Sequence, residues 1–258
     1  MSTALVTGAS EGIGRDLAFV LAEHKHDLVI TARNGERLEA LATELRSTFG
    51  VRVEVIVKDL AKPQAAGELF DEIQTRGILI DLLINNAGFG GHGRFDQEDV
   101  NEILGMLQVN IVALTHLTRL FLPQMVERKS GRIMNLASVA AFQPGPLMAV
   151  YYATKAYVLS FSEAIAAELK RTGVTVTAVC PGPTTTEFQK RAGVETAPAF
   201  QSGMVMESMP VARIGYRAMM RGKRVVITGI QNKLMVAASR LVPRRVLISV
   251  VKKMNESR

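Results

Sequence analysis

Cysteine is almost absent from this 258-residue sequence, which contains only Cys180. A single cysteine cannot close a disulfide within the chain, and this excludes the small disulfide-stapled class of secreted domains. The first residues run directly into the apolar stretch TALVTG, with no charged, long apolar leader before it. We therefore expect a reducing, cytoplasmic location, with Cys180 packed at the end of a buried strand and not acting as a nucleophile.

Tryptophan is absent and tyrosine occurs four times, so the sequence lacks the interleaved aromatic residues on which nucleic-acid bases stack. No nucleic-acid partner is expected. Long hydrophobic runs are also missing. The longest apolar segment, residues 234–251, is interrupted by Arg240, Pro243, Arg244 and Arg245 before it could span about 30 Å of hydrocarbon. No transmembrane helix is predicted.

Acidic residues are scarce near the carboxyl end of the sequence. Residues 213–258 hold 12 Lys and Arg against one acid, Glu256, a net charge of +11, whereas 19 basic and 23 acidic residues give the rest −4. Such a surface can meet an anionic membrane, an acidic carrier protein or a phosphate-bearing substrate, and it can equally be a solvated basic face. We treat residues 230–258 as a basic C-terminal extension and keep these alternatives open.

Short β-branched runs alternate with longer amphipathic patterns through most of the chain. The runs are apolar on both faces, as buried parallel strands are, and the helical patterns at 34–49 and 162–173 end near a glycine. These features predict a single α/β domain over residues 1–258, a Rossmann-type doubly wound parallel sheet of about seven strands with helices on both faces. The expected strands are 3–7, 27–31, 51–57, 81–84, 132–136, 174–179 and 224–228.

A glycine-rich segment, TGASEGIG, follows the first expected strand and precedes an amphipathic helix. In this setting Gly8 can make the tight turn, Gly12 can let the backbone approach a pyrophosphate, and Gly14 can let helix and strand pack closely. The amino end of the helix adds partial positive charge that favours phosphate. The segment therefore predicts dinucleotide binding.

Seven motifs in order resemble those of the short-chain dehydrogenase/reductase family over roughly residues 3–190. They are TGxxxGxG from Thr7 to Gly14, Asp59-Leu60, NNAG at 85–88, Asn110, Ser138, Tyr151 with Lys155, and PGPTTT at 181–186. The resemblance implies a nicotinamide cofactor. Its implied binding residues are Gly8, Ser10, Gly12, Ile13, Gly14, Arg33, Asp59, Leu60, Asn86, Ala87, Gly88, Tyr151, Lys155, Pro181, Gly182 and Thr186.

Two of these cofactor residues carry more specific expectations. The resemblance implies that Asp59 accepts a hydrogen bond from the adenine amino group. It also implies that Thr186 meets the nicotinamide carboxamide, although Thr186 could equally be the N-cap of a helix that begins near Glu187.

The end of the second expected strand indicates which nicotinamide cofactor is preferred. An acid there accepts the ribose 2′-hydroxyl of NAD, whereas an arginine accommodates the 2′-phosphate of NADP. This strand ends in TARNGERL, with Arg33 and no acid before Glu36, which predicts NADP(H) over NAD(H). Glu11 opposes this prediction, since NADP-preferring relatives often have a basic residue just before the second glycine. An ordinary surface role for Arg33 also stays open.

The stretch YYATK at 151–155 offers two tyrosines and one lysine. On a helix, Lys155 lies about 40° around the axis from Tyr151 and about 60° from Tyr152, which favours Tyr151 only slightly. The family pattern selects Tyr151, because Ser138 lies 13 residues before it. The resemblance then implies that Tyr151 donates the proton with its pKa lowered by Lys155, Ser138 binds the substrate oxygen, and Asn110 fixes a water leading from Lys155.

Residues 186–210 lie where the family keeps its substrate lid. Their side chains suit an aliphatic or polycyclic ketone, or belong to the core; the apolar ones are Phe188, Phe200, Met204, Met206 and Met209. Tyr152 is expected in the helix packing or the pocket wall. His92 lies in the loop GFGGHG, and no second histidine or cysteine has ligand spacing, so no metal site is expected.

Together these features predict an NADP(H)-dependent oxidoreductase that reversibly reduces a ketone or aldehyde, with an apolar or acyl-type carbonyl substrate. The alternative is a non-catalytic NADP(H)-binding regulator or scaffold, which would have no need of a tuned acid. The resemblance implies a homodimer or homotetramer formed through the helices that bear Asn110 and Tyr151.

Overall fold

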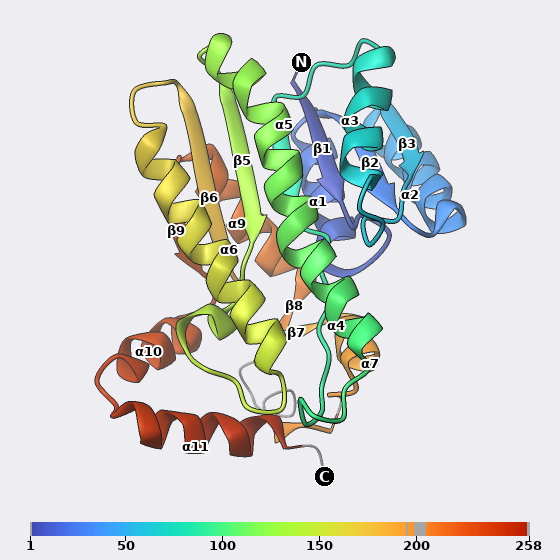
Figure 1. Cartoon of the computed structure of the whole chain (residues 1–258). Coiled ribbons are helices and arrows are strands. Elements are labelled where there is room, and N and C mark those ends of the chain that lie inside the picture. The colour runs from blue at the N-terminus through green and yellow to red at the C-terminus, as the bar shows by residue number, and fades with distance from the viewer. Residues whose placement is uncertain (1, 195, 199–204, 257–258) are drawn as a thin grey trace.

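The computed structural model describes residues 2–194, 196–198 and 205–256. Seven parallel strands form one sheet in the order β3-β2-β1-β4-β5-β6-β9 (Figure 1). The strands are β1 (Thr3–Thr7), β2 (Asp27–Ala32), β3 (Val53–Val57), β4 (Leu82–Asn85), β5 (Gly131–Leu136), β6 (Val174–Cys180) and β9 (Val225–Ile227). This architecture confirms the predicted doubly wound sheet, and the predicted strand ends differ from the observed ones by one or two residues.

Helices cover both faces of the sheet. One layer holds α1 (Gly12–Glu23), α2 (Gly35–Phe49) and α9 (Ser208–Met220); the other holds α3 (Ala65–Thr75), α4 (Val100–Leu107), the π-helix η1 (Gln108–Ala113), α5 (Leu114–Glu127) and α6 (Ala149–Glu168). Alternation along β1 explains the two cores, because Ala4 and Val6 pack into the first and Leu5 into the second.

Local sequence signals set the helix ends. The Asn34 side chain accepts a hydrogen bond from the Arg37 N–H and so caps the amino end of α2. Gly50 closes the same helix in a left-handed conformation, with φ of 66°. The predicted 34–49 pattern is therefore confirmed as a helix.

Smaller elements lie below the sheet, at the carboxyl ends of its strands (Figure 1). They are the 3₁₀ helix η2 (Val139–Phe142), the two-stranded β7 (Thr184–Thr185) and β8 (Met206–Glu207), and helices α7 (Phe188–Ala192), α10 (Ile230–Ser239) and α11 (Arg244–Asn255). The β7–β8 pair was not predicted, because two residues are too few to show alternation. Within the segment 186–210, Phe200 and Met204 lie outside the described residues.

One helical segment of the described chain, Val100–Glu127, is long and apolar enough to cross a membrane by length and composition alone. This segment was not predicted, because the longest apolar run in the sequence was taken to be residues 234–251. In the fold the segment comprises α4, η1 and α5, which pack on β4, β5 and α6. It contributes Val109, Leu117 and Phe121 to the core, so part of its apolar surface is packed within the protein, whereas Val100, Leu104 and Val112 are exposed.

Candidate active site

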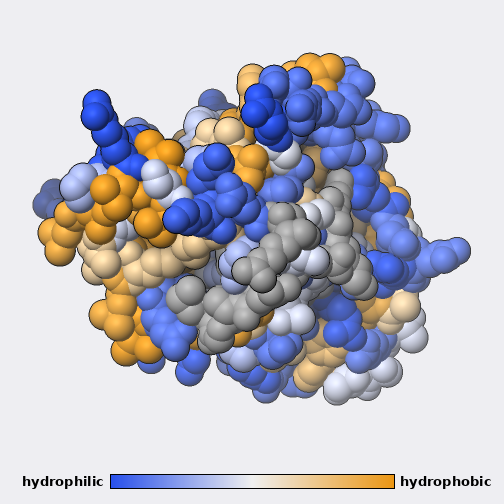
Figure 2. All heavy atoms as spheres, turned by 90° about the horizontal axis from the view of Figure 1, so that it is seen from below, coloured by the Kyte–Doolittle hydropathy of each residue, from blue (hydrophilic) through white to orange (hydrophobic). Residues whose placement is uncertain are grey.

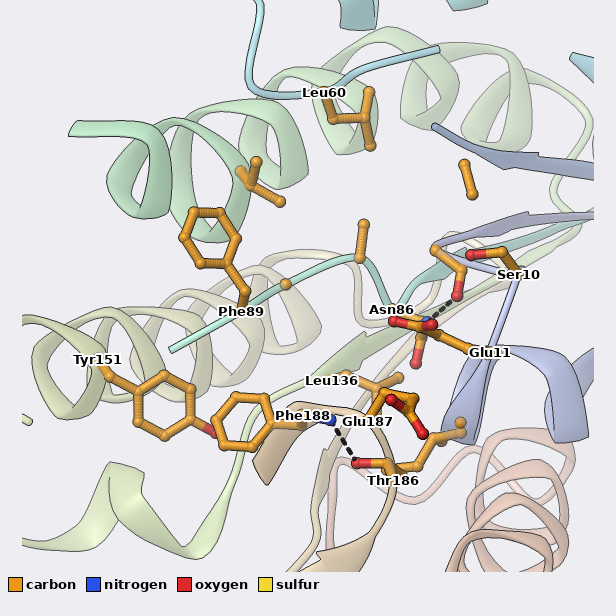
Figure 3. A pocket seen from close by; sticks show the side chains of 18 of the residues that line it. Ser10, Glu11, Leu60, Asn86, Phe89, Leu136, Tyr151, Thr186, Glu187 and Phe188 are labelled. Atoms are coloured by element: carbon orange, nitrogen blue, oxygen red, sulfur yellow. Dashed lines mark hydrogen bonds between the residues drawn. The ribbon is translucent and has the colours of Figure 1, made fainter. Parts of the chain in front are cut away.

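A cleft of about 1160 Å³ opens beyond the carboxyl ends of the strands, where ligands of open parallel sheets bind. Every predicted site residue except Asn110 lines it: Gly8, Ser10, Gly12, Ile13, Gly14, Arg33, Asp59, Leu60, Asn86, Ala87, Gly88, Ser138, Tyr151, Lys155, Pro181, Gly182 and Thr186. The fold thus brings together residues from six separate loops. Figure 3 shows part of this lining, with Ser10, Glu11 and Asn86 on one side and Tyr151 and Phe188 on the other.

The glycine loop between β1 and α1 has the geometry its sequence predicts. Gly8 and Gly12 have φ of 65° and 55°, a region that side chains disfavour. A Cβ on Gly14 would lie 2.1 Å from the Gly8 carbonyl oxygen, so only glycine lets α1 approach this closely. One side of the loop backbone therefore faces the cleft, and the other side packs tightly against Asn86.

Asn86 braces this loop from behind. Its side-chain amide donates to the carbonyl oxygens of Thr7 and Gly8, at 2.9 and 3.0 Å. Asn85 points the other way and donates to Thr118 and Asn135, which ties β4 to α5 and β5. Asn85 therefore ties neighbouring elements together, whereas Asn86 holds the shape of the glycine loop.

The adenosine end of the cleft holds two further cations besides Arg33, and both are paired with carboxylates. Arg33 is exposed at its edge, and Arg37 and Lys58 also line it. The carboxylate of Glu11, which seemed to oppose a phosphate there, forms a 2.6 Å ion pair with Arg37. Arg37 was missed because it lies inside a helix with no motif to mark it; only its one-turn distance from Arg33 could have suggested it.

Ser138, Tyr151 and Lys155 meet at the other end of the cleft. Ser138 follows β5 and caps η2, since its Oγ accepts from the Ala140 N–H at 3.1 Å. Lys155 Nζ donates to the Leu136 carbonyl oxygen at 2.7 Å and lies 5.7 Å from the centre of the Tyr151 ring. The Ser138 hydroxyl donates to the Pro181 carbonyl oxygen at 3.4 Å and is close enough to the Tyr151 phenol to influence its pKa. The predicted serine, tyrosine and lysine are therefore neighbours.

The direction of the Tyr151 pKa differs from the prediction. Burial raises the pKa of this phenol above its usual range, and the nearby Ser138 hydroxyl opposes the rise only in part. Burial also lowers the pKa of Lys155 to about 8. The prediction that Lys155 lowers the Tyr151 pKa was wrong for the protein alone, because the low dielectric that surrounds both groups disfavours both charges.

Asn110 is buried in η1, outside the cleft lining. Its amide donates to the Phe89 carbonyl oxygen and to Thr154, and its Oδ1 accepts from the Phe89 N–H at 3.1 Å. A π-helix inside a longer helix is rare and often marks a functional position. Asn110 thereby fixes the loop after β4 against α6; its predicted role in holding a water stays a prediction.

The segment after β6 lies over Tyr151. The rings of Phe188 and Tyr151 are 5.2 Å apart between centres, and Figure 3 shows them side by side. Thr186 accepts a hydrogen bond from the Phe188 N–H at 3.2 Å, so the capping role left open for Thr186 is observed. Met209 packs against the core, whereas Phe188 lines the cleft beside Tyr151.

Asn255 is a cleft residue that the sequence analysis did not identify. It lies at the end of α11, accepts a 3.1 Å bond from the Tyr152 hydroxyl and donates to the Pro146 carbonyl oxygen. Its own carbonyl oxygen is 2.7 Å from Nε2 of His92. Tyr152 therefore belongs to the wall, and His92 is a loop residue held by the last helix. No sequence signal marked a partner 103 residues from Tyr152.

The residues present fit a nicotinamide dinucleotide. The first turn of α1 has no acidic residue and its N-cap, Glu11, makes no side-chain cap bond, so its N–H groups face the cleft without a side-chain partner. Gly12 keeps the space beside these N–H groups open, because a Cβ at this position would lie 3.0 Å from the Thr186 side chain. Fold and cleft together define a Rossmann-type dinucleotide-binding protein.

The comparisons with known proteins agree with this class. The family model described as short chain dehydrogenase matches residues 2–196, and the chain belongs to that family. A very-long-chain 3-oxoacyl-CoA reductase of Anas platyrhynchos is 35% identical over 193 residues, which cover 72% of this chain and 61% of the relative. The chain thus spans about three fifths of that protein's length. Human 17-beta-hydroxysteroid dehydrogenase type 3 is 32% identical over 82% of this chain and 68% of its own.

A solved structure is also similar over almost the whole chain. The short-chain dehydrogenase from Sphingobium yanoikuyae in complex with NADPH has a TM-score of 0.83 and 35% identity, covering 93% of this chain and 95% of that one. The bulky-bulky ketone specific alcohol dehydrogenase from Comamonas testosteroni has a TM-score of 0.79 and 30% identity, covering 93% and 92%.

Proposed function

We propose that this protein is an NADP(H)-dependent oxidoreductase that reversibly reduces a ketone or aldehyde to an alcohol, with an apolar or acyl-type carbonyl substrate. The observation that carries the proposal is the meeting of Ser138, Tyr151 and Lys155 at one end of a cleft whose other end is a glycine-rich cradle. When bound, the cofactor supplies the hydride. The chain itself must orient the carbonyl and supply a proton.

The proton comes from Tyr151 Oη. Because burial raises the pKa of this phenol, it is protonated at neutral pH and available to the far more basic alkoxide that carbonyl reduction creates. Ser138 Oγ lines the same end of the cleft as the Tyr151 phenol and can donate to the same substrate oxygen. Lys155, with its pKa near 8, can hold or release a proton close to neutrality beside this group.

The cofactor proposal rests on charge at the adenosine end. Arg33 is exposed at the edge of the cleft, where it can meet a 2′-phosphate, and the Glu11 carboxylate that argued against NADP(H) is paired with Arg37. Arginine suits phosphate because its planar donors bind two oxygens at once. The similarity to a dehydrogenase solved with NADPH supports the same cofactor.

The substrate proposal rests on the wall around Tyr151. Met148, Ala192, Val194 and Ala197 form an apolar cluster against Tyr151, Tyr152 and Phe188, which disfavours small polar sugars and suits an aliphatic or ring ketone. The two curated relatives named above act, by their names, on 3-oxoacyl-CoA and hydroxysteroid substrates, and both substrate types present apolar surface.

The experiment is a ketone panel in which the loss of NADPH absorbance is followed with purified protein. The panel contains a 3-oxoacyl thioester, a 17-ketosteroid and an aryl alkyl ketone, with a keto sugar as the polar control. Turnover of apolar ketones and not of the sugar supports the proposal. Saturable NADPH binding without turnover of any ketone would favour the regulator or scaffold instead.

A further inference from the structure

Helix α10 presents an apolar stripe to solvent. Ile230 and Leu234 lie one turn apart and are 75% and 65% exposed, and Leu241 in the turn that follows is 87% exposed. The opposite side of the helix faces inward through Asn232 and Val236, which are buried. A helix of a soluble protein usually buries its apolar side and exposes its polar side. The stripe of Ile230 and Leu234 is a second apolar side of α10, and it has no partner among the described residues.

The orientation of α10 is fixed by its inward side. Asn232 donates to the Thr228 carbonyl oxygen at 2.8 Å and fills the space beside Gly182, where a Cβ would lie 2.3 Å from its amide. Rotation of α10 to hide Ile230 and Leu234 would pull Asn232 out of this contact. The packing of Asn232 therefore keeps Ile230 and Leu234 turned outward.

Helix α11 extends the same surface. Val251 and Asn255 face inward, whereas Val246 and Val250, one turn apart, are 52% and 48% exposed. In Figure 1 the two helices lie together at the lower left, outside the layers that cover the sheet. Figure 2 shows this end from below, with orange side chains gathered at its left and blue ones beside them. We call the exposed residues 230–253 of this pair the α10–α11 surface.

The charge of the α10–α11 surface is uniformly positive. Its cations are Lys233, Arg240, Arg244, Arg245, Lys252 and Lys253. Among the described residues only Lys252 has an acidic neighbour, Glu256 at 3.8 Å, and that residue lies on the same helix. The other cations have no carboxylate within 4 Å in the described part of the chain.

We propose that the α10–α11 surface docks on an anionic phospholipid membrane. A projecting apolar stripe inserts into fluid acyl chains whatever its shape, and neighbouring cations meet the lipid phosphates, with their long side chains reaching the headgroup level. The combination of unpaired cations with exposed aliphatic residues is what such an interface requires.

The other occupants fit less well. A second copy of the chain would bring two surfaces of the same positive sign together, which is unfavourable for the unpaired cations. An acidic folded protein would neutralise the charge, but it would need a pocket shaped for Ile230, Leu234 and Leu241. A bilayer supplies both negative charge and apolar depth without such a match.

The test is sedimentation of the full-length protein with phosphatidylcholine vesicles, with and without phosphatidylglycerol. We expect binding only to the anionic vesicles, and weaker binding at high salt. Leu234→Ser/Leu241→Ser removes the stripe without changing charge and should weaken binding at least about tenfold. Arg240→Gln/Arg244→Gln removes two cations and should weaken it by roughly fivefold per cation. The matched control is Leu79→Ser/Arg119→Gln, which changes an exposed leucine and an exposed arginine on other elements.

Three outcomes would overturn the proposal: no binding to anionic vesicles, binding that both test variants retain at the control level, or a change in oligomeric state of the leucine variant in the absence of lipid. The last result would identify a second copy as the occupant. Activity on a water-soluble ketone should be equal in all variants, so the failure of docking is distinguishable from failure of the reductase proposal.

Discussion

The hydroxyl of Tyr152 donates a 3.1 Å hydrogen bond to Oδ1 of Asn255, and this bond separates the roles of two adjacent tyrosines. The Tyr152 hydroxyl holds helix α11, whereas Tyr151 lines the cleft together with Ser138. Only Tyr151 has a hydroxyl directed to the proposed chemistry.

Replacement of Tyr151 by Phe should lower kcat by about 10²–10⁴-fold, the range that general acids contribute, and should leave NADPH binding intact. Tyr152→Phe removes the bond to Asn255 but not the acid, so kcat should change less than about threefold while KM for the ketone rises. Steady-state kinetics on the same ketone compare the two. If Tyr152→Phe were the inactive variant, the proton donor would be misassigned.

Cofactor choice should depend on Arg33 and on the Glu11–Arg37 pair. Arg33→Ala should raise KM for NADPH by about 10–100-fold, because a hydrogen bond to a charged group contributes about 1.5–3 kcal/mol, and should barely change KM for NADH. Glu11→Gln frees the Arg37 guanidinium and should lower KM for NADPH. An unchanged NADPH/NADH ratio in both variants would remove these residues from the 2′-phosphate.

Gly14→Ala should disrupt the glycine loop. The new methyl would lie 2.1 Å from the Gly8 carbonyl oxygen and 2.3 Å from the Asn86 amide, and such overpacking costs about 1–3 kcal/mol. Thermal unfolding should show a lower Tm, and cofactor fluorescence should show weaker NADPH binding.

Gly67→Ala is the matched control for that change. Gly67 lies within α3, and the nearest atom to its Cβ position is 3.8 Å away, so alanine should stabilise the helix by roughly 0.5–1 kcal/mol. Equal Tm losses in the two variants would show that the contact behind Gly14 is not the cause.

The buried ammonium of Lys155 should make stability depend on pH. Burial lowers its pKa from 10.5 to about 8, so between these values the unfolded chain binds more protons than the native one, and the free energy of unfolding rises with pH. The slope from this group is at most about 1.4 kcal/mol per pH unit. Urea unfolding at a series of pH values from 8 upward measures it.

Lys155→Met isolates this contribution. Burial also raises the pKa of the Cys180 thiol to about 12, and this lowers the free energy of unfolding above pH 9. Because the effect occurs in the wild type and in the variant, it largely cancels when their free energies of unfolding are subtracted. The wild-type minus variant difference should therefore rise with pH between 8 and 10.5. A flat difference would mean that the ammonium is hydrated in the native state.

Much of the fold could be predicted from the sequence, because buried parallel strands and amphipathic helices leave periodic signals. The glycine loop was also predictable from local sequence. Gly8 and Gly12 have a positive φ, and Gly14 stands where a side chain has no room. Ser138, Tyr151 and Lys155 were found through their spacing, and the fold brings them together.

Contacts between distant segments left no such signal. The pairing of Glu11 with Arg37 depends on how the amino ends of α1 and α2 face each other. The position of Asn255 depends on the path of the whole carboxyl-terminal segment. The pKa of Tyr151 depends on how the surrounding fold buries its ring, which a helical wheel cannot show.

Because Asn255 reaches the cleft from the end of α11, the two ends of the cleft are built from separate stretches of sequence. The sheet, the glycine loop and Tyr151 all precede residue 230 in the chain, and the partner of Tyr152 follows it. Substitutions in the carboxyl-terminal helices can therefore reshape the substrate end of the cleft and leave the dinucleotide cradle intact.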